Sequence, residues 1–157
     1  MIDVEIEDAA WTAALPDAVA ITRAAAQAAL NSEGADGEGV TLLLADDAAV
    51  RELNLRFRDQ DKPTNVLSFP APPNPERFLG DVALAYGVCA REAAEQGKPL
   101  VHHLQHLVAH GVLHLLGYDH MNDDEAEAME GLERQVLAGL GVPDPYAAGE
   151  GDHDHRP

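Results

Sequence analysis

The chain has 157 residues, of which 46% are hydrophobic, and a formal net charge of −18. This length and apolar content predict one soluble domain with a hydrophobic core, and no segment approaches the ~20 apolar residues of a membrane span. The negative charge argues against long-range attraction to a polyanion such as RNA, unless basic residues gather locally. Four of the ten basic residues do fall close together: Arg51, Arg56, Arg58 and Lys62.

The N-terminus and the cysteine content bear on the cellular compartment. Residues 1–7 alternate apolar and acidic side chains and lack the basic start and apolar run of a secretory signal. Cys89 is the only cysteine, which excludes an internal disulfide, and we expect it to be a small buried residue on a helix. A cytoplasmic protein without membrane association is therefore predicted.

Apolar periodicity, capping residues and loop composition predict the secondary structure. In the first half of the chain the predicted elements are a strand at 2–6, a helix at 17–30, a buried strand at 40–45 and a helix from Asp46 to about Phe57. In the second half they are strands at 66–69 and 79–86, followed by helices at 88–96, 99–116 and 123–140.

The order of these elements predicts the fold class. Strands come early and helices cluster late, which indicates an α+β domain with a small mixed sheet of about four strands packed with about five helices. Residues 1–142 are expected to form this single domain. The tail at 143–157 is rich in Pro, Gly, Asp and His, and we expect it to be disordered.

Three histidines are spaced so that they can meet on one metal ion. His110 and His114 are four residues apart, which places both on one face of a helix. Gly117 can turn the chain out of that helix, and His120 can then return as a third ligand. Three nitrogens leave one tetrahedral position open for water, as at a catalytic zinc. We therefore predict one Zn²⁺ per chain; the alternative is a helix with satisfied core histidines.

The same helix carries further histidines at 102, 103 and 106. A helix rises ~1.5 Å per residue, so the series from 102 to 114 spans ~18 Å and cannot share one ion. Only the pair at 110 and 114 lies beside a glycine turn that returns another histidine. We expect the earlier histidines at the helix surface or behind the metal ligands.

The histidine spacing also matches the H-E-x-x-H-x-x-G-x-x-H pattern of zinc metalloproteases, with one exception. The glutamate that acts as general base in those enzymes is Gly111 here, so peptide hydrolysis by that route is disfavoured. Asp119 precedes the last histidine and could act on the metal-bound water or brace a ligand. Its alternative role is a turn residue after Gly117.

A second segment, Leu53–Phe69, joins the arginine-bearing end of a helix to a strand through a polar loop. The planar guanidinium suits phosphate oxygens, and an arginine near a metal would supply the second positive group that a phosphoryl transition state requires. The alternative is that Arg56 and Arg58 are helix-terminus cations beside Asp59 and Asp61.

The two segments together resemble the YbeY family of bacterial rRNA maturation factors, which are single-strand-specific endoribonucleases. The family motif H-G-x-L-H-L-x-G-Y-D-H matches residues 110–120 throughout, and L-N-x-x-[YF]-R-x-x-D-x-P-T-[DN]-V-L-S-F matches residues 53–69. The shorter element Leu79-Gly80-Asp81 also fits, and the match extends in order over about residues 40–140.

The resemblance implies a zincin-like fold in which His110, His114 and His120 bind zinc and Arg58 is important for RNA cleavage. It implies a role in 3′-end maturation of 16S rRNA and in ribosome quality control. The implied partners are rRNA, the small ribosomal subunit, a small-subunit ribosomal protein and the Era GTPase. The strong acidity departs from this picture, and suggests that the ribosome presents the RNA.

Two other functions stay open. One is a non-catalytic ribosome-assembly factor in which zinc holds the helix and its following turn together. The other is a zinc metallopeptidase, which the ligand spacing favours and Gly111 opposes. For the nuclease, the nucleophile is either the metal-bound water or the 2′-hydroxyl of the RNA.

Overall fold

The structure is a computed structural model that describes residues 1–118 and 122–146, and in these residues it holds four strands and six helices. The strands are β1 (Ile2–Ile6), β2 (Gly39–Ala45), β3 (Val66–Pro70) and β4 (Phe78–Ala85). The helices are α1 (Ala10–Ala14), α2 (Ala18–Ser32), α3 (Asp47–Arg58), α4 (Tyr86–Glu95), α5 (Leu100–Leu115) and α6 (Asp123–Gly139). The predicted α+β class is confirmed.

Every predicted element is present within a few residues of its predicted ends, and α1 is an addition. The sequence does not predict α1 because five residues make little more than one turn, too short for a helical period to show. Asp46 caps α3 as expected, since its side chain accepts a hydrogen bond from the backbone N–H of Ala49 at 2.7 Å. Cys89 is fully buried on α4, also as expected.

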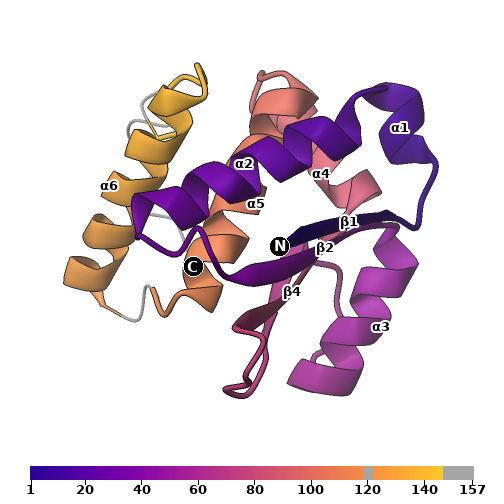
Figure 1. Ribbon diagram of the computed structural model, residues 1–157. Helices are drawn as coiled ribbons and strands as arrows, with labels where there is room; N and C mark the ends of the chain where they lie inside the picture. The colour runs from indigo at the N-terminus through magenta and orange to yellow at the C-terminus, as the bar shows by residue number, and fades with distance from the viewer. Residues whose placement is uncertain (119–121, 147–157) are drawn as a thin grey trace.

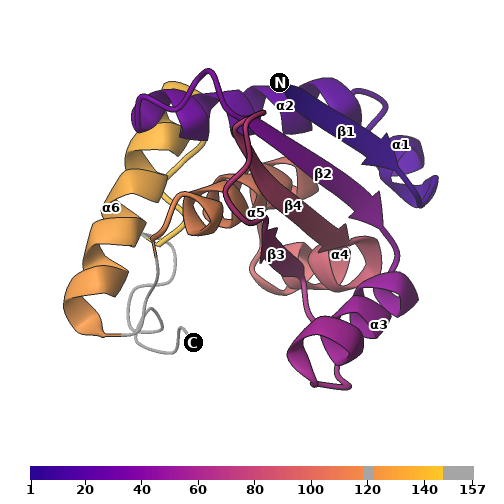
Figure 2. The same ribbon diagram turned by 60° about the horizontal axis from the view of Figure 1, so that its bottom comes forward.

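The four strands form one mixed sheet in the order β1-β2-β4-β3 (Figure 2). β1, β2 and β4 run parallel, and β3 pairs antiparallel with β4. β3 is therefore an edge strand, with one side paired to β4. Because successive side chains of a strand point to opposite faces, each strand contributes to both sides of the sheet.

Helices cover the two faces of the sheet unequally. α2 lies above the sheet, and α5 packs against α2, β3 and β4 (Figure 1). α3 lies on the opposite, lower side of the sheet (Figure 1). The larger core cluster joins α2 and α5 to sheet residues such as Val40, Leu42 and Leu84. The smaller one joins Val50 of α3 to residues such as Leu67. α6 packs on α2 and α5, on the side of α5 away from α3 (Figure 1).

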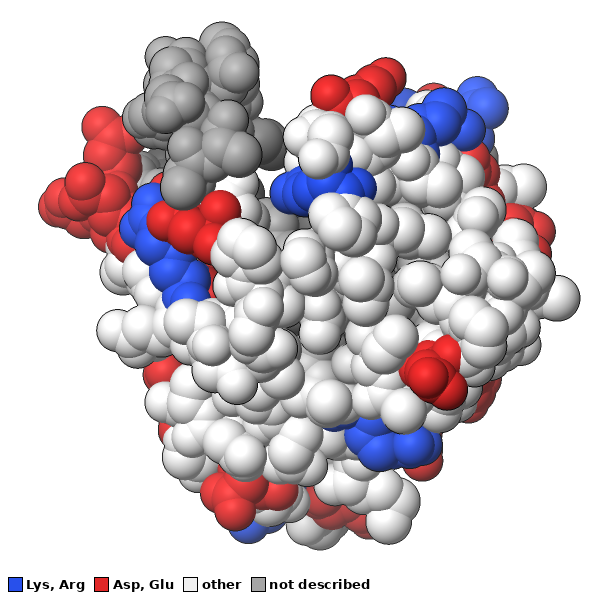
Figure 3. Space-filling view, turned by 90° about the horizontal axis from the view of Figure 1, so that it is seen from above, with Lys and Arg blue, Asp and Glu red and all other residues white. Residues whose placement is uncertain are grey.

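One face of the molecule presents few charged side chains. Seen from above, over α2, uncharged residues predominate, and the charged side chains form small separate groups (Figure 3). Within residues 1–118 and 122–146, no helix combines the length and the apolar character needed to cross a bilayer. Of the predicted tail, residues 143–146 are described, and the Tyr146 hydroxyl donates to the Glu133 carboxylate; residues 147–157 lie outside the described part.

Candidate metal centre

The last two turns of α5 bring His110 and His114 together, as the sequence predicts. Their Nε2 atoms are 3.1 Å apart, and the two ring planes are nearly perpendicular, with centroids 4.5 Å apart. Four-residue spacing puts the two side chains one turn apart on one helix face. Both rings therefore direct Nε2 into the same small volume.

A carboxylate behind His110 determines which ring nitrogen carries the proton. His110 Nδ1 lies 2.8 Å from Glu133 Oε2, and Glu133 is 1% exposed. Burial alone would raise the pKa of Glu133, but hydrogen bonds from His106 and His110 outweigh it and hold that pKa well below its usual range. An ionised carboxylate only accepts hydrogen bonds, so His110 Nδ1 is the donor and the neutral ring keeps a lone pair on Nε2.

The turn after α5 determines which ring nitrogen of His114 carries the proton. His114 Nδ1 donates to the backbone carbonyl of Tyr118 at 2.9 Å, which leaves the lone pair of the neutral ring on Nε2. Gly117 makes this possible with a φ of 105°, and its N–H bonds to the His114 carbonyl while the Tyr118 N–H bonds to the Leu113 carbonyl. These two bonds are those of a Schellman motif, which ends helices at a left-handed glycine.

The same turn is tied to α2. The Tyr118 hydroxyl donates to Glu33 Oε1 at 2.6 Å, and this bond to the carboxylate is the main cause of the raised pKa of Tyr118. The carbonyl that orients His114 thus belongs to a residue anchored at both its backbone and its side chain.

The geometry fits a bound cation. With both Nδ1 protons committed, the neutral rings turn their Nε2 lone pairs toward each other, an arrangement that a proton or a cation between the two atoms stabilises. Two zinc ligands at ~2.1 Å from the ion and at a tetrahedral angle lie ~3.4 Å apart, close to the 3.1 Å found for His110 and His114. Within the described residues no group of three His, Cys, Asp or Glu side chains could hold a metal. The predicted third ligand, His120, and Asp119 lie outside the described residues.

Glu133 is the residue of this centre that the sequence analysis missed. It lies on α6, on the buried helix face that also carries Met129, Val136 and Leu137. Its other carboxylate oxygen, Oε1, accepts a hydrogen bond from His106 Nε2 at 2.7 Å. An acidic residue on the apolar face of an amphipathic helix is a signal that the sequence does contain, because burying an unpaired carboxylate is costly.

His103 and His106, which precede His110 on α5, belong to two different hydrogen-bond networks. His106 lies behind His110, joined to it through Glu133, as expected for a residue that supports a ligand. His103 is 3% exposed and bonds instead to Glu92 Oε1 at 2.8 Å, an oxygen that also accepts from the Asn65 side chain at 2.9 Å. These hydrogen bonds lower the pKa of Glu92, although burial alone would raise it. His103 is thus part of a separate network between α5, α4 and the start of β3.

Arg58 lies at the edge strand. Its Nη2 donates to the backbone carbonyl of Ser68 at 2.5 Å, and the Ser68 hydroxyl donates to the backbone carbonyl of Gly111 at 3.0 Å. Since Gly111 follows His110, one residue of β3 connects the arginine to the helix that carries the histidine pair. Arg56 and Arg58 do lie in the last turn of α3, as the alternative of helix-terminus cations predicts. Of the two acidic residues nearby, Asp61 pairs with Arg51 at 2.8 Å.

Gly111 sits where α5 packs tightly against the sheet. A Cβ added there would lie 2.6 Å from Val82 Cγ1 and 3.3 Å from the Ser68 hydroxyl oxygen. A glutamate at this position would have to displace a β4 side chain that is fully buried. The packing thus gives a physical reason for glycine at the position where metalloproteases carry their general base.

Comparisons with known proteins identify the family of this chain. The family model described as Endoribonuclease YbeY matches residues 3–141. A protein from Azorhizobium caulinodans named Endoribonuclease YbeY is 55% identical over 153 residues, covering 93% of this chain and 96% of the relative. A protein of the same name from Bradyrhizobium diazoefficiens is 53% identical over 149 residues, covering 88% and 81%.

A solved structure has the same fold. The solution structure of a Thermotoga maritima protein is similar with a TM-score of 0.57 and 25% sequence identity, covering 90% of this chain and 92% of that one. The family match spans nearly all of the described residues, including both segments that the sequence analysis singled out. The chain therefore belongs to the YbeY family.

Proposed function

We propose that this protein is a zinc-dependent endoribonuclease that cleaves single-stranded RNA. The observation that carries the proposal is the pair of Nε2 atoms of His110 and His114, 3.1 Å apart with both Nδ1 protons committed to fixed acceptors. The relatives named Endoribonuclease YbeY support the reaction class. We take His120 as the third ligand because its place in the family motif follows the Gly117 turn.

The chain's own residues prepare the site for this ion. When bound, zinc would polarise a phosphate oxygen or lower the pKa of a bound water toward ~7. Glu133 and the Tyr118 carbonyl hold the two rings in one tautomer and one orientation, and such partners raise the basicity of the ligand nitrogen. The ligand pair of His110 and His114 is thereby oriented before a metal arrives, and neither of these two rings has to reorganise.

Arg58 is the group that we propose to contact the phosphate. A guanidinium carries five N–H donors, and the bond to the Ser68 carbonyl accounts for one of them. The side chain is exposed and is held at the edge strand beside α5. Its remaining donors can bind the non-bridging oxygens of the scissile phosphate and stabilise the charge that builds there. The nucleophile is either a metal-bound water or the RNA's own 2′-hydroxyl.

We further propose that the substrate is the 3′ region of 16S rRNA and that the enzyme also acts in ribosome quality control. Small ribosomal subunits, a small-subunit ribosomal protein and the Era GTPase are the proposed partners. The net charge of −18 opposes capture of free RNA over long distances. Presentation of the RNA by the ribosome would remove the need for such attraction.

One assay separates this function from its rivals. The purified protein is incubated in parallel with a single-stranded RNA, a duplex of the same sequence and casein. The proposal predicts cleavage of the single strand alone, because Gly111 replaces the glutamate that serves as general base in the matching metalloproteases. Cleavage of casein would contradict it. Intact RNA in the presence of stoichiometric zinc would favour a structural zinc in an assembly factor.

A further inference from the structure

The C-terminal end of α3 carries an aromatic ring that faces solvent. Phe57 is 62% exposed, and among the described residues the other large hydrophobic side chains exposed to a similar degree are Met1 and Leu55. Most of this phenyl ring therefore gains nothing from burial within the fold. Its position one residue before Arg58 places it beside the group proposed to contact the phosphate.

The exposed ring is held in place by a second aromatic residue. Phe57 and Phe69 lie with their centroids 5.4 Å apart and their planes inclined by 64°, an edge-to-face contact. Phe69 belongs to β3 and is half-buried against the smaller core cluster under the sheet. The pair thus joins a solvent-exposed ring to a residue anchored in the fold.

Two guanidinium groups flank these rings. The Arg56 guanidinium lies 5.5 Å from the Phe57 centroid, and that of Arg58 lies 6.0 Å from the Phe69 centroid. In the described part of the chain neither arginine lies within ion-pair distance of a carboxylate. Of the other described arginines, Arg23 on α2 also has no such partner, and four have one: Arg51, Arg77, Arg91 and Arg134. In a chain with 28 acidic residues, this is where positive charge is left available beside aromatic surface.

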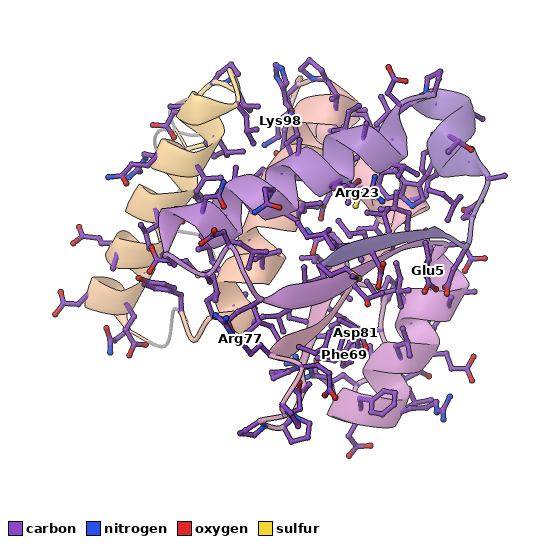
Figure 4. The ribbon with its side chains drawn as sticks, in the orientation of Figure 1. Glu5, Arg23, Phe69, Arg77, Asp81 and Lys98 are labelled. Carbon is purple, nitrogen blue, oxygen red and sulfur yellow. The ribbon has the colours of Figure 1, made fainter. Side chains whose placement is uncertain are left out.

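Acidic side chains lie under the sheet, next to the aromatic and arginine residues of the β3 edge. Figure 4 shows Phe69 and Asp81 close together under the sheet, with Glu5 further along the same side. Asp81 lies opposite Phe69 in the β3–β4 register, and burial together with the Glu5 charge raises its pKa. Asp81 and Glu5 thus place acidic side chains on the inner strand β4 and on β1, whereas the two arginines lie at the β3 edge of the sheet.

We propose that Phe57 is a stacking subsite for one unpaired nucleobase of the RNA substrate, with Arg56 binding a neighbouring phosphate. The proposal rests on the proposed ribonuclease function and places the adjacent nucleotides along the line from Phe57 through Arg58 to the histidine pair. Interleaved aromatic and cationic side chains suit single-stranded nucleic acid, because a base stacks on the ring while its phosphate binds the charge. Paired bases cannot reach the ring, so the subsite also disfavours duplex RNA.

The test compares two substitutions at one position and one beside it. Binding of a fluorescently labelled single-stranded RNA is measured by anisotropy for Phe57→Leu, Phe57→Trp and Leu55→Ala, with zinc content and melting temperature as controls. Phe57→Leu keeps an apolar side chain but loses the aromatic face, and we expect about tenfold weaker binding. Phe57→Trp should bind at least as tightly as the unmodified protein, and Leu55→Ala should bind normally.

The tryptophan variant also gives a direct readout of stacking. The only native tryptophan, Trp11, is fully buried, so an indole introduced at position 57 is the one whose emission a stacked base would quench. Normal RNA affinity of Phe57→Leu, or RNA binding to Phe57→Trp without quenching, would overturn the subsite. Equal losses in Leu55→Ala and Phe57→Leu would also overturn it, in favour of a general apolar docking patch. Quenching by an RNA that is bound but never cut would support the subsite while contradicting the nuclease function.

Discussion

The α5–α6 region and the β3 edge contain the same ingredients, charged groups beside rings, but arrange them in opposite ways. Behind the histidine pair, the charge of Glu133 is buried and bonded by two histidines and a tyrosine. At the edge, Arg56 and Arg58 are exposed, without a carboxylate partner in the described residues. A rigid, enclosed carboxylate suits the support of an ion held in one geometry, whereas exposed cations suit the binding of a flexible polyanion.

Metal removal should have the largest effect on the enclosed region. Dialysis against a strong chelator should abolish RNA cleavage, and added Zn²⁺ should restore it, because the histidine pair alone cannot supply the charge that a phosphoryl transition state requires. Zinc content and cleavage are measured on the same sample. Full cleavage by protein without detectable metal would show that the enclosed region is not a catalytic centre.

Arg58→Gln tests the contribution of the β3 edge separately from that of the histidine pair, because the substitution removes a charge at the edge only. We expect RNA cleavage to fall ~10²–10³-fold with zinc content unchanged, the usual cost of removing one group that stabilises transition-state charge. The matched control is Arg51→Gln on the same helix, whose guanidinium is already paired with Asp61. Equal activity of the two variants would remove Arg58 from the site.

Glu133→Gln tests the support behind the ligands. The amide keeps the shape of the carboxylate but loses its charge, and we expect zinc affinity to fall ~10–100-fold. Competition with a coloured zinc chelator measures the affinity. Glu127→Gln, at an exposed position of the same helix, is the control and should bind zinc normally. Identical affinities for the two variants would mean that Glu133 only fills space.

Two glycine substitutions give the smallest effects, of opposite sign. Gly111→Ala should destabilise the fold by ~1–3 kcal/mol, because the added methyl group overpacks the contact with Val82. Gly131→Ala, in α6 with nothing within 4 Å of the new Cβ, should stabilise it by ~0.5–1 kcal/mol. Urea unfolding measures both. Destabilisation by both changes would show that the close contact with Val82 is not what makes a side chain at position 111 unfavourable.

The sequence predicted the fold class, the strands and the long helices because apolar periodicity reports directly which face of an element is buried. It also predicted that His110 and His114 share a helix face, which follows from spacing alone. It did not predict Glu133 or Ser68, because they reach the histidines and Arg58 through tertiary contacts 23 and 10 residues away in the chain. The exposure of Phe57 depends likewise on how α3 docks against β3.

The most direct test of the account measures zinc content and RNA cleavage on the same preparations of the unmodified protein, His114→Ala and His102→Ala. His102 lies on the same helix, outside the network around Glu133, and serves as the control. We expect one zinc per chain and cleavage in the unmodified protein and in His102→Ala, with both lost in His114→Ala. Undiminished cleavage by metal-free His114→Ala would contradict this expectation.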